Sequence, residues 1–125
     1  MRILSIVESP AHPRLESRFK TLGHELEIVN SQRKAIATIK KQPPNVVFAE
    51  FFYGWGNNYA GVNISNLDVF LYSLQRYAPE ARVVVMVDKG EREYVDKLND
   101  IVPLAAVLVN PVTPEQAERT LLEIV

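Results

Sequence analysis

The sequence contains no cysteine, only five glycines, and no hydrophobic run near the length of a membrane span. Without cysteine the chain forms no disulfide, has no thiolate nucleophile and cannot build a zinc site on sulfur. A bilayer-spanning helix needs about 20 consecutive apolar residues, and no such run occurs. The first residues reach Glu8 and Pro10 too early for the apolar core of a signal peptide. We therefore expect a cytoplasmic protein that is not embedded in a membrane.

A charge excess of either sign is also absent. The chain has 14 Lys and Arg residues against 15 Asp and Glu residues, which gives a net charge of −1. Nucleic acids and anionic membranes attract strongly basic proteins, so neither is expected as the main partner. With 47% hydrophobic and 23% charged residues, the chain has the composition of a globular protein. Its 125 residues correspond to one domain, 1–125.

Short apolar segments alternate with segments of helical periodicity along the whole chain. Branched apolar residues predict strands at 3–7, 26–29, 45–51, 83–87 and 105–109. Helical spacing predicts five helices, which carry Leu15/Phe19/Leu22, Ala35/Ile36/Ile39, Ile64/Leu67/Phe70/Leu71/Leu74, Tyr94/Val95/Leu98/Ile101 and Ala117/Thr120/Leu121/Ile124. Ser31 and Thr113 are predicted N-caps, and Gly23, Pro43-Pro44 and Pro79 end helices.

This alternation predicts an α/β fold with a doubly wound sheet. Strands that are apolar on both faces belong in a parallel sheet covered by helices on both sides. Right-handed crossovers leave few topologies, and the leading one is the flavodoxin-like five-stranded order 2-1-3-4-5. In such a sheet, ligands bind beyond the carboxyl ends of the strands, so the residues that end each strand are the candidate site.

Acidic and polar residues stand at these strand ends. Glu8-Ser9 follows the first strand, Glu50 ends the third, Val87-Asp88-Lys89 ends the fourth, and Asn110-Pro111 follows the fifth. The chain resembles the CheY-like receiver domain of two-component response regulators over essentially its whole length. The segments that carry the resemblance are 3–9, 44–50, 84–90 and 109–115.

The resemblance implies a phosphoacceptor pocket, but this chain departs from the family at each key position. Family receivers hold magnesium with two adjacent acids, where this chain has Glu8-Ser9. They accept phosphoryl on an Asp, where Glu50 stands, and contact the group through a hydroxyl and a lysine, where Val87 and Asn110 stand. Glu50 is one methylene longer than Asp, which moves its carboxylate by roughly 1.5 Å, and errors of about 1 Å can cost about 100-fold in rate.

We therefore interpret the chain as a pseudo-receiver, a non-catalytic regulatory module that binds proteins and uses no cofactor. Glu50 then imitates the charged acceptor, paired with Lys89; alternatively Glu8 and Glu50 are merely solvated acids in a shallow groove. A working phosphoacceptor receiver and a small-molecule-binding flavodoxin-like protein are the competing functions. Neither Gly-x-Gly-x-x-Gly nor Gly-x-x-x-x-Gly-Lys-Ser/Thr occurs.

Three further features are candidates for binding. Glu8 and Glu50 allow a weak divalent-ion site, and His12 on the adjacent loop is a candidate ligand or pH sensor. The long connection 52–63 is a candidate partner-binding loop, or a lid with no partner, because it gathers the aromatic residues Phe52, Tyr53, Trp55 and Tyr59. The last helix and its neighbours form a candidate homodimer face, as the resemblance implies, with Tyr94 beside it and with Arg92, Asp96, Arg119 and Glu123 as candidate pairing charges.

Overall fold

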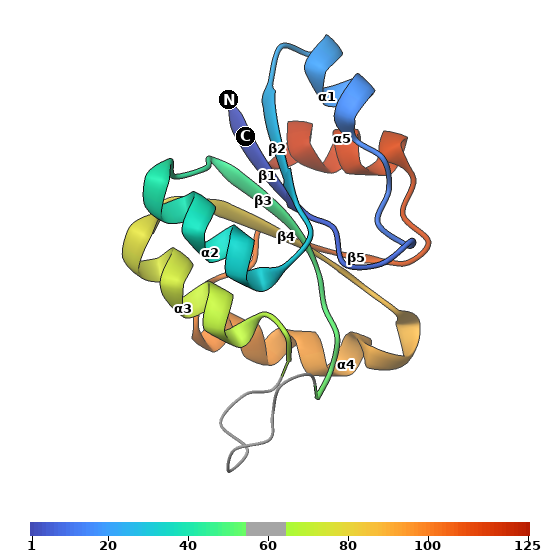
Figure 1. Cartoon of the computed structure of the whole chain (residues 1–125). Helices are drawn as coiled ribbons and strands as arrows, with labels where there is room; N and C mark the ends of the chain where they lie inside the picture. The colour runs from blue at the N-terminus through green and yellow to red at the C-terminus, as the bar shows by residue number, and fades with distance from the viewer. Residues whose placement is uncertain (55–64) are drawn as a thin grey trace.

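A five-stranded parallel sheet forms the centre of the molecule in a computed structural model that describes residues 1–54 and 65–125 (Figure 1). The strand order is β2-β1-β3-β4-β5, which confirms the prediction. The strands are β1 (Arg2–Ile6), β2 (Glu25–Val29), β3 (Val46–Glu50), β4 (Arg82–Val87) and β5 (Ala106–Val109).

Helices cover both faces of the sheet. Figure 1 shows α1 (Glu16–Thr21) and α5 (Pro114–Ile124) on one face, with α2 (Gln32–Lys41), α3 (Asp68–Tyr77) and α4 (Arg92–Val95) on the other. Short 3-10 helices, η1 (Lys89–Glu91) and η2 (Asp96–Asp100), flank α4. Among the helices in the described ranges, none is long and apolar enough to cross a membrane.

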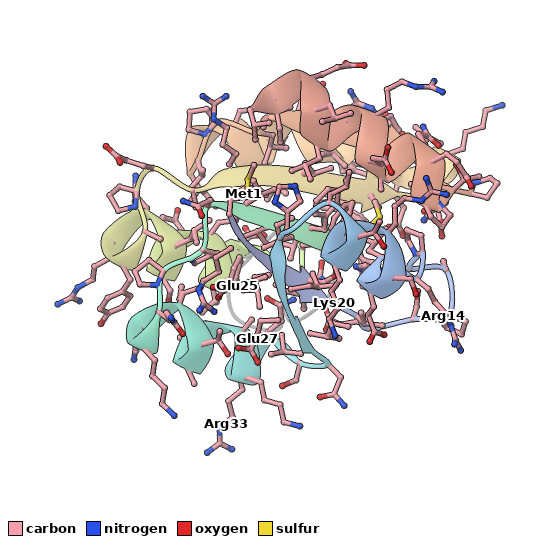
Figure 2. All side chains as sticks on the ribbon, turned by 90° about the horizontal axis from the view of Figure 1, so that it is seen from above. Met1, Arg14, Lys20, Glu25, Glu27 and Arg33 are labelled. Atoms are coloured by element: carbon pink, nitrogen blue, oxygen red, sulfur yellow. The ribbon has the colours of Figure 1, made fainter. Side chains whose placement is uncertain are left out.

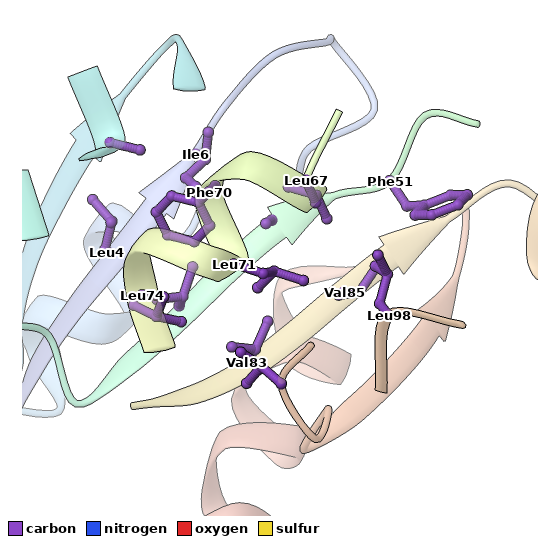
Figure 3. Close-up of a cluster of buried hydrophobic side chains, with 14 of the residues drawn as sticks. Leu4, Ile6, Phe51, Leu67, Phe70, Leu71, Leu74, Val83, Val85 and Leu98 are labelled. Carbon is purple, nitrogen blue, oxygen red and sulfur yellow. The ribbon is translucent and has the colours of Figure 1, made fainter. Parts of the chain in front are cut away.

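Two buried clusters hold the layers together because each central strand is apolar on both faces. In one cluster Leu4 and Val83 of the strands pack against Phe70 and Leu74 of α3 (Figure 3). In the other, Phe48 of β3 packs against α1 and α5, and its ring centroid lies 5.5 Å from that of Phe19. All five residues of β3 are buried, including the terminal Glu50.

The predicted N-caps are confirmed. The Ser31 hydroxyl accepts a hydrogen bond from the backbone of Lys34, and the Thr113 hydroxyl accepts one from Gln116, each at 3.1 Å. Gly23 follows α1 with a φ of 87°, a conformation that favours glycine.

Two helices differ from their predictions. The sequence predicts the third helix from near Ile64, which lies outside the described residues, and α3 begins at Asp68. The Asp68 carboxylate accepts hydrogen bonds from the backbone and hydroxyl of Ser65, and these hold Ser65 in the turn before the helix. The fourth is only four residues of α-helix followed by a 3-10 helix. The buried residues Val95, Leu98 and Ile101 are three residues apart, which is the period of the 3-10 helix that lies between the first and the last of them.

β2 forms one edge of the sheet and has more exposed residues than any of the other four strands. Glu25 and Glu27 are exposed, and Figure 2 labels both on this strand. Glu25 receives an ion pair of 2.7 Å from Arg2 of the neighbouring β1. Ile28 remains 41% exposed.

Candidate functional site

The carboxylate of Glu50 lies at the C-terminal end of β3, and the residue is only 2% exposed. Its Oε2 accepts hydrogen bonds from the backbone N–H groups of Glu8 and Ser9, at 2.7 and 3.1 Å. Its Oε1 accepts a hydrogen bond from the Ser9 hydroxyl. All three donors belong to the segment that follows β1, so Glu50 fastens this segment to β3. The alternative that Glu50 is merely solvated is therefore wrong.

The second acid, Glu8, is held by two neutral amides. Its Oε1 accepts hydrogen bonds from Nε2 of Gln32 at 2.7 Å and from Nδ2 of Asn66 at 3.1 Å. None of the ion pairs formed within the described part of the chain includes Glu8 or Glu50. Both side chains are thus held by neutral hydrogen-bond donors and not by a cation of the described residues.

Asn66 is a site residue that sequence reasoning missed. Besides Glu8, its Nδ2 donates to the backbone carbonyl of Glu50 at 2.8 Å, and its Oδ1 accepts from the backbone N–H of Phe52 at 2.8 Å. The residue is 6% exposed. It therefore joins the ends of β1 and β3 to the start of α3. No local signal distinguishes this asparagine from an ordinary loop asparagine.

The other predicted pocket residues provide neither a hydroxyl nor a cation close to Glu50. Val87 is buried in the apolar cluster under α3 and α4. Nδ2 of Asn110 donates to Oδ1 of Asp88 at 2.8 Å. Lys89 is exposed, and no ion pair among residues 1–54 and 65–125 joins it to Glu50. The expected pairing does not form because the Glu50 carboxylate is directed toward the N–H groups that follow β1.

His12 is buried rather than displayed beside the acids. It is 7% exposed, its Nε2 lies 2.9 Å from the Ser5 hydroxyl, and its Nδ1 lies 2.9 Å from the carbonyl oxygen of Pro13. Its hydrogen bonds therefore go to the β1 strand and to its own loop, not to Glu8 or Glu50. Within the described residues, no group of three or more acidic or histidine side chains is arranged to hold a metal ion.

The start of the predicted partner-binding loop is fixed to α4. The Tyr53 ring stacks on the Tyr94 ring with a centroid separation of 3.8 Å and an interplanar angle of 18°. The backbone N–H of Tyr53 also donates to Oε1 of Glu91 at 3.0 Å. Trp55 and Tyr59 lie outside the described residues, so the remainder of the loop stays a prediction.

The Tyr94 phenol lies in an acidic environment. The carboxylate of Glu93 raises the pKa of Tyr94 above its ordinary value of 10.0, and burial, Tyr53 and Glu91 act in the same direction. The neutral phenol is therefore the form that this surface favours.

The charges expected at a homodimer interface are exposed or paired within the chain. Arg92 forms an ion pair of 3.0 Å with Asp96, one turn further along the same segment. Arg119 and Glu123 are exposed on α5. A dimer through this face stays a prediction.

Comparison with known proteins identifies the fold but no close relative. No family model matches the chain, and no curated protein matches it. The chemotaxis response regulator CheY4 of Vibrio cholerae is 17% identical with a TM-score of 0.74, over 99% of this chain and 98% of CheY4. NtrX from Brucella abortus is 19% identical with a TM-score of 0.70, over 98% of this chain. A streptococcal redox sensor, described as evolved from two-component response regulators, is 12% identical with a TM-score of 0.74, over 99% of this chain.

The matched proteins differ in length. The chain spans 27% of the NtrX chain and 51% of the streptococcal chain, but nearly all of CheY4. These likenesses, together with the sheet order, show that the chain has the CheY-like flavodoxin fold.

Proposed function

We propose that this CheY-like domain is a pseudo-receiver, a non-catalytic signalling module that acts through protein contacts and takes no phosphoryl group on Glu50. The observation that carries the proposal is the use of the Glu50 carboxylate inside the fold. Both of its oxygens accept hydrogen bonds, from the backbones of Glu8 and Ser9 and from the Ser9 hydroxyl. The acid that stands in place of the phosphoacceptor is therefore a structural anchor.

Phosphoryl transfer to this carboxylate would require groups that its surroundings do not supply. The attacking oxygen has to be free and in line, and a cation has to stabilise the charge that develops on the transferred group. Neither oxygen is free to attack: Oε2 would first have to give up the hydrogen bonds from the backbones of Glu8 and Ser9, and Oε1 the one from the Ser9 hydroxyl. Asn110 stands where a lysine would contribute, and deleting one such stabilising donor costs about 3 kcal/mol of barrier in other enzymes.

The same anchor keeps the ends of β1 and β3 in one arrangement. A carboxylate held by three donors keeps the segment after β1 against the end of β3, without any change on phosphorylation. Such a module presents a constant surface to partner proteins, and a different input has to modulate it. The streptococcal protein, described as a redox sensor evolved from response regulators, supports an input other than phosphorylation.

A working receiver is the competing function, because Glu8 and Glu50 do lie together at the ends of adjacent strands β1 and β3. Incubation with acetyl phosphate and Mg²⁺, followed by intact-protein mass spectrometry, separates the two. We expect no added phosphoryl group, with Vibrio cholerae CheY4 as the positive control. A labile gain of one phosphoryl group that Glu50→Gln abolishes would overturn the pseudo-receiver.

A further inference from the structure

A cavity of about 330 Å³ lies on the α1 side of the sheet, between β1, β2 and the segment that joins β1 to α1. Its walls are largely apolar and include Val7, Pro13, Leu26 and Ile28. The buried pair Ser5 and His12 also lines it. The volume falls in the range of small-molecule sites, which typically combine apolar walls with a few placed polar groups.

The hydrogen bonds of the Ser5–His12 pair define which polar group a ligand has to bring. A carbonyl oxygen only accepts, so the contact between Nδ1 of His12 and the Pro13 carbonyl places the proton on Nδ1. In the neutral imidazole, Nε2 is then an acceptor, and it takes the hydroxyl proton of Ser5 at 2.9 Å. The pair therefore offers the cavity only the remaining lone pairs of the Ser5 oxygen.

We propose that this cavity binds a small phenol, whose ring lies against the apolar walls and whose hydroxyl donates to the Ser5 oxygen. An aromatic ring suits the walls formed by Leu26 and Ile28. Arg14 and Glu16 also line the cavity but are exposed to water, whereas a hydroxyl donor would give the buried Ser5 oxygen a second hydrogen-bond partner. A ligand that only accepts hydrogen bonds would instead meet the Ser5 lone pairs without compensation.

The location of the cavity connects it to the anchor at Glu50. Ser9 lines the cavity, and its backbone and hydroxyl both donate to the Glu50 carboxylate. Occupation of the cavity therefore acts on the segment that Glu50 fastens. This makes the phenol an input to the pseudo-receiver in place of phosphorylation, and that regulatory role rests on the proposed function.

Fluorine NMR of two matched probes tests the binding site. We expect 4-fluorophenol to bind saturably, and 4-fluoroanisole, which lacks the donor, to bind between about two- and tenfold more weakly, as loss of one hydrogen bond implies. Ser5→Val combined with His12→Leu removes both acceptors of the pair that lines the cavity, so this double variant is expected to abolish the preference. Absence of saturable 4-fluorophenol binding at millimolar concentration, or equal affinity for both probes, would overturn the proposal.

Two tryptophan variants locate the site. Ile28→Trp is expected to fill the cavity and abolish binding, and it is tolerable because Ile28 is 41% exposed. Val69→Trp is the matched control, since Val69 is 54% exposed on α3 and does not line the cavity. Binding that survives Ile28→Trp, with the fold verified by circular dichroism, would refute the location.

The regulatory role has its own readout. Saturation with 4-fluorophenol is expected to shift the backbone amide resonances of Glu8 and Ser9, whose N–H groups bind Glu50. Unchanged amide resonances of Glu8 and Ser9 would refute the regulatory role of the phenol, but they would not refute the binding site. The pseudo-receiver proposal is tested separately, since phosphoryl incorporation from acetyl phosphate would refute it whether or not the cavity binds a phenol.

Discussion

Replacement of Glu50 by alanine is expected to destabilise the domain severely. The change removes the acceptor of three hydrogen bonds, from two backbone N–H groups and the Ser9 hydroxyl. A hydrogen bond to a charged group contributes about 1.5–3 kcal/mol. Because Glu8 and Ser9 are only partly buried, water replaces some of the lost acceptor, and we expect a total loss of about 3–5 kcal/mol. Native proteins have a free energy of unfolding of about 5–15 kcal/mol, so this loss is a large share of the total.

Two conservative variants separate the anchor from simple loss of volume. Glu50→Gln keeps an oxygen to accept from the backbones of Glu8 and Ser9, and its amide can donate to the Ser9 hydroxyl, so we expect a loss of about 1–2 kcal/mol. Glu50→Asp keeps the charge but withdraws it by roughly 1.5 Å, which lengthens all three bonds. We expect its loss to lie between those of the glutamine and alanine variants.

Urea unfolding followed by far-ultraviolet circular dichroism measures these differences. With a slope of about 1–3 kcal/mol per molar urea, the alanine variant should unfold at least about 1 M earlier than the parent chain. Glu123→Ala, at an exposed position on α5, serves as the control and should change stability by less than about 0.5 kcal/mol. An alanine variant as stable as this control, or a glutamine variant as unstable as the alanine one, would refute the anchor.

Three further predictions follow from single contacts. Asn66→Ala removes the hydrogen bonds that the Asn66 side chain makes with Glu8, with the Glu50 carbonyl and with the Phe52 N–H, so it should lower the free energy of unfolding by about 2–3 kcal/mol in the same urea assay; a loss below about 0.5 kcal/mol would contradict the bridging role. Burial and the nearby N-terminal amine lower the pKa of His24 below its ordinary 6.5, so the unfolded chain binds the proton more tightly, and stability should fall as the pH decreases through 6.5 toward the lower native value. His24→Asn should reduce that fall in urea titrations at several pH values, and an unchanged pH profile would contradict it. Thr113→Ala removes the N-cap of α5 and should cost about 1 kcal/mol by thermal unfolding, whereas Thr113→Ser should cost little.

The backbone fold follows from the sequence because its signals are local. Runs such as Val83–Val87 are apolar on both faces, and such strands are typical of a parallel sheet that is covered by helices on both sides. The caps at Ser31 and Thr113 are equally local, since each hydroxyl binds an N–H three residues later. The sequence predicts a helix at Tyr94–Ile101 but not its 3-10 part, because a stripe with a spacing of three residues suits an α-helix and a 3-10 helix alike.

The site was only partly predictable because its contacts join residues far apart in the chain. The strand ends identified Glu8 and Glu50 as neighbours, which the structure brings together through the backbone of Glu8. The direction of the Glu50 side chain, and hence its distance from Lys89, depends on which donors surround it. Asn66 contacts Glu8, Glu50 and Phe52, which lie 58, 16 and 14 residues earlier in the chain, and no periodicity in the sequence predicts such contacts. The burial of His12 likewise depends on Ser5, seven residues earlier on β1.

The two edges of the sheet are chemically unequal. β2 exposes Glu25 and Glu27, so two copies that meet along this edge bring like charges together. β5, over Ala106–Val109, carries no charged residue. Pairing of two copies along the β2 edge is therefore opposed by charge, whereas the β5 edge carries no such opposition to strand addition.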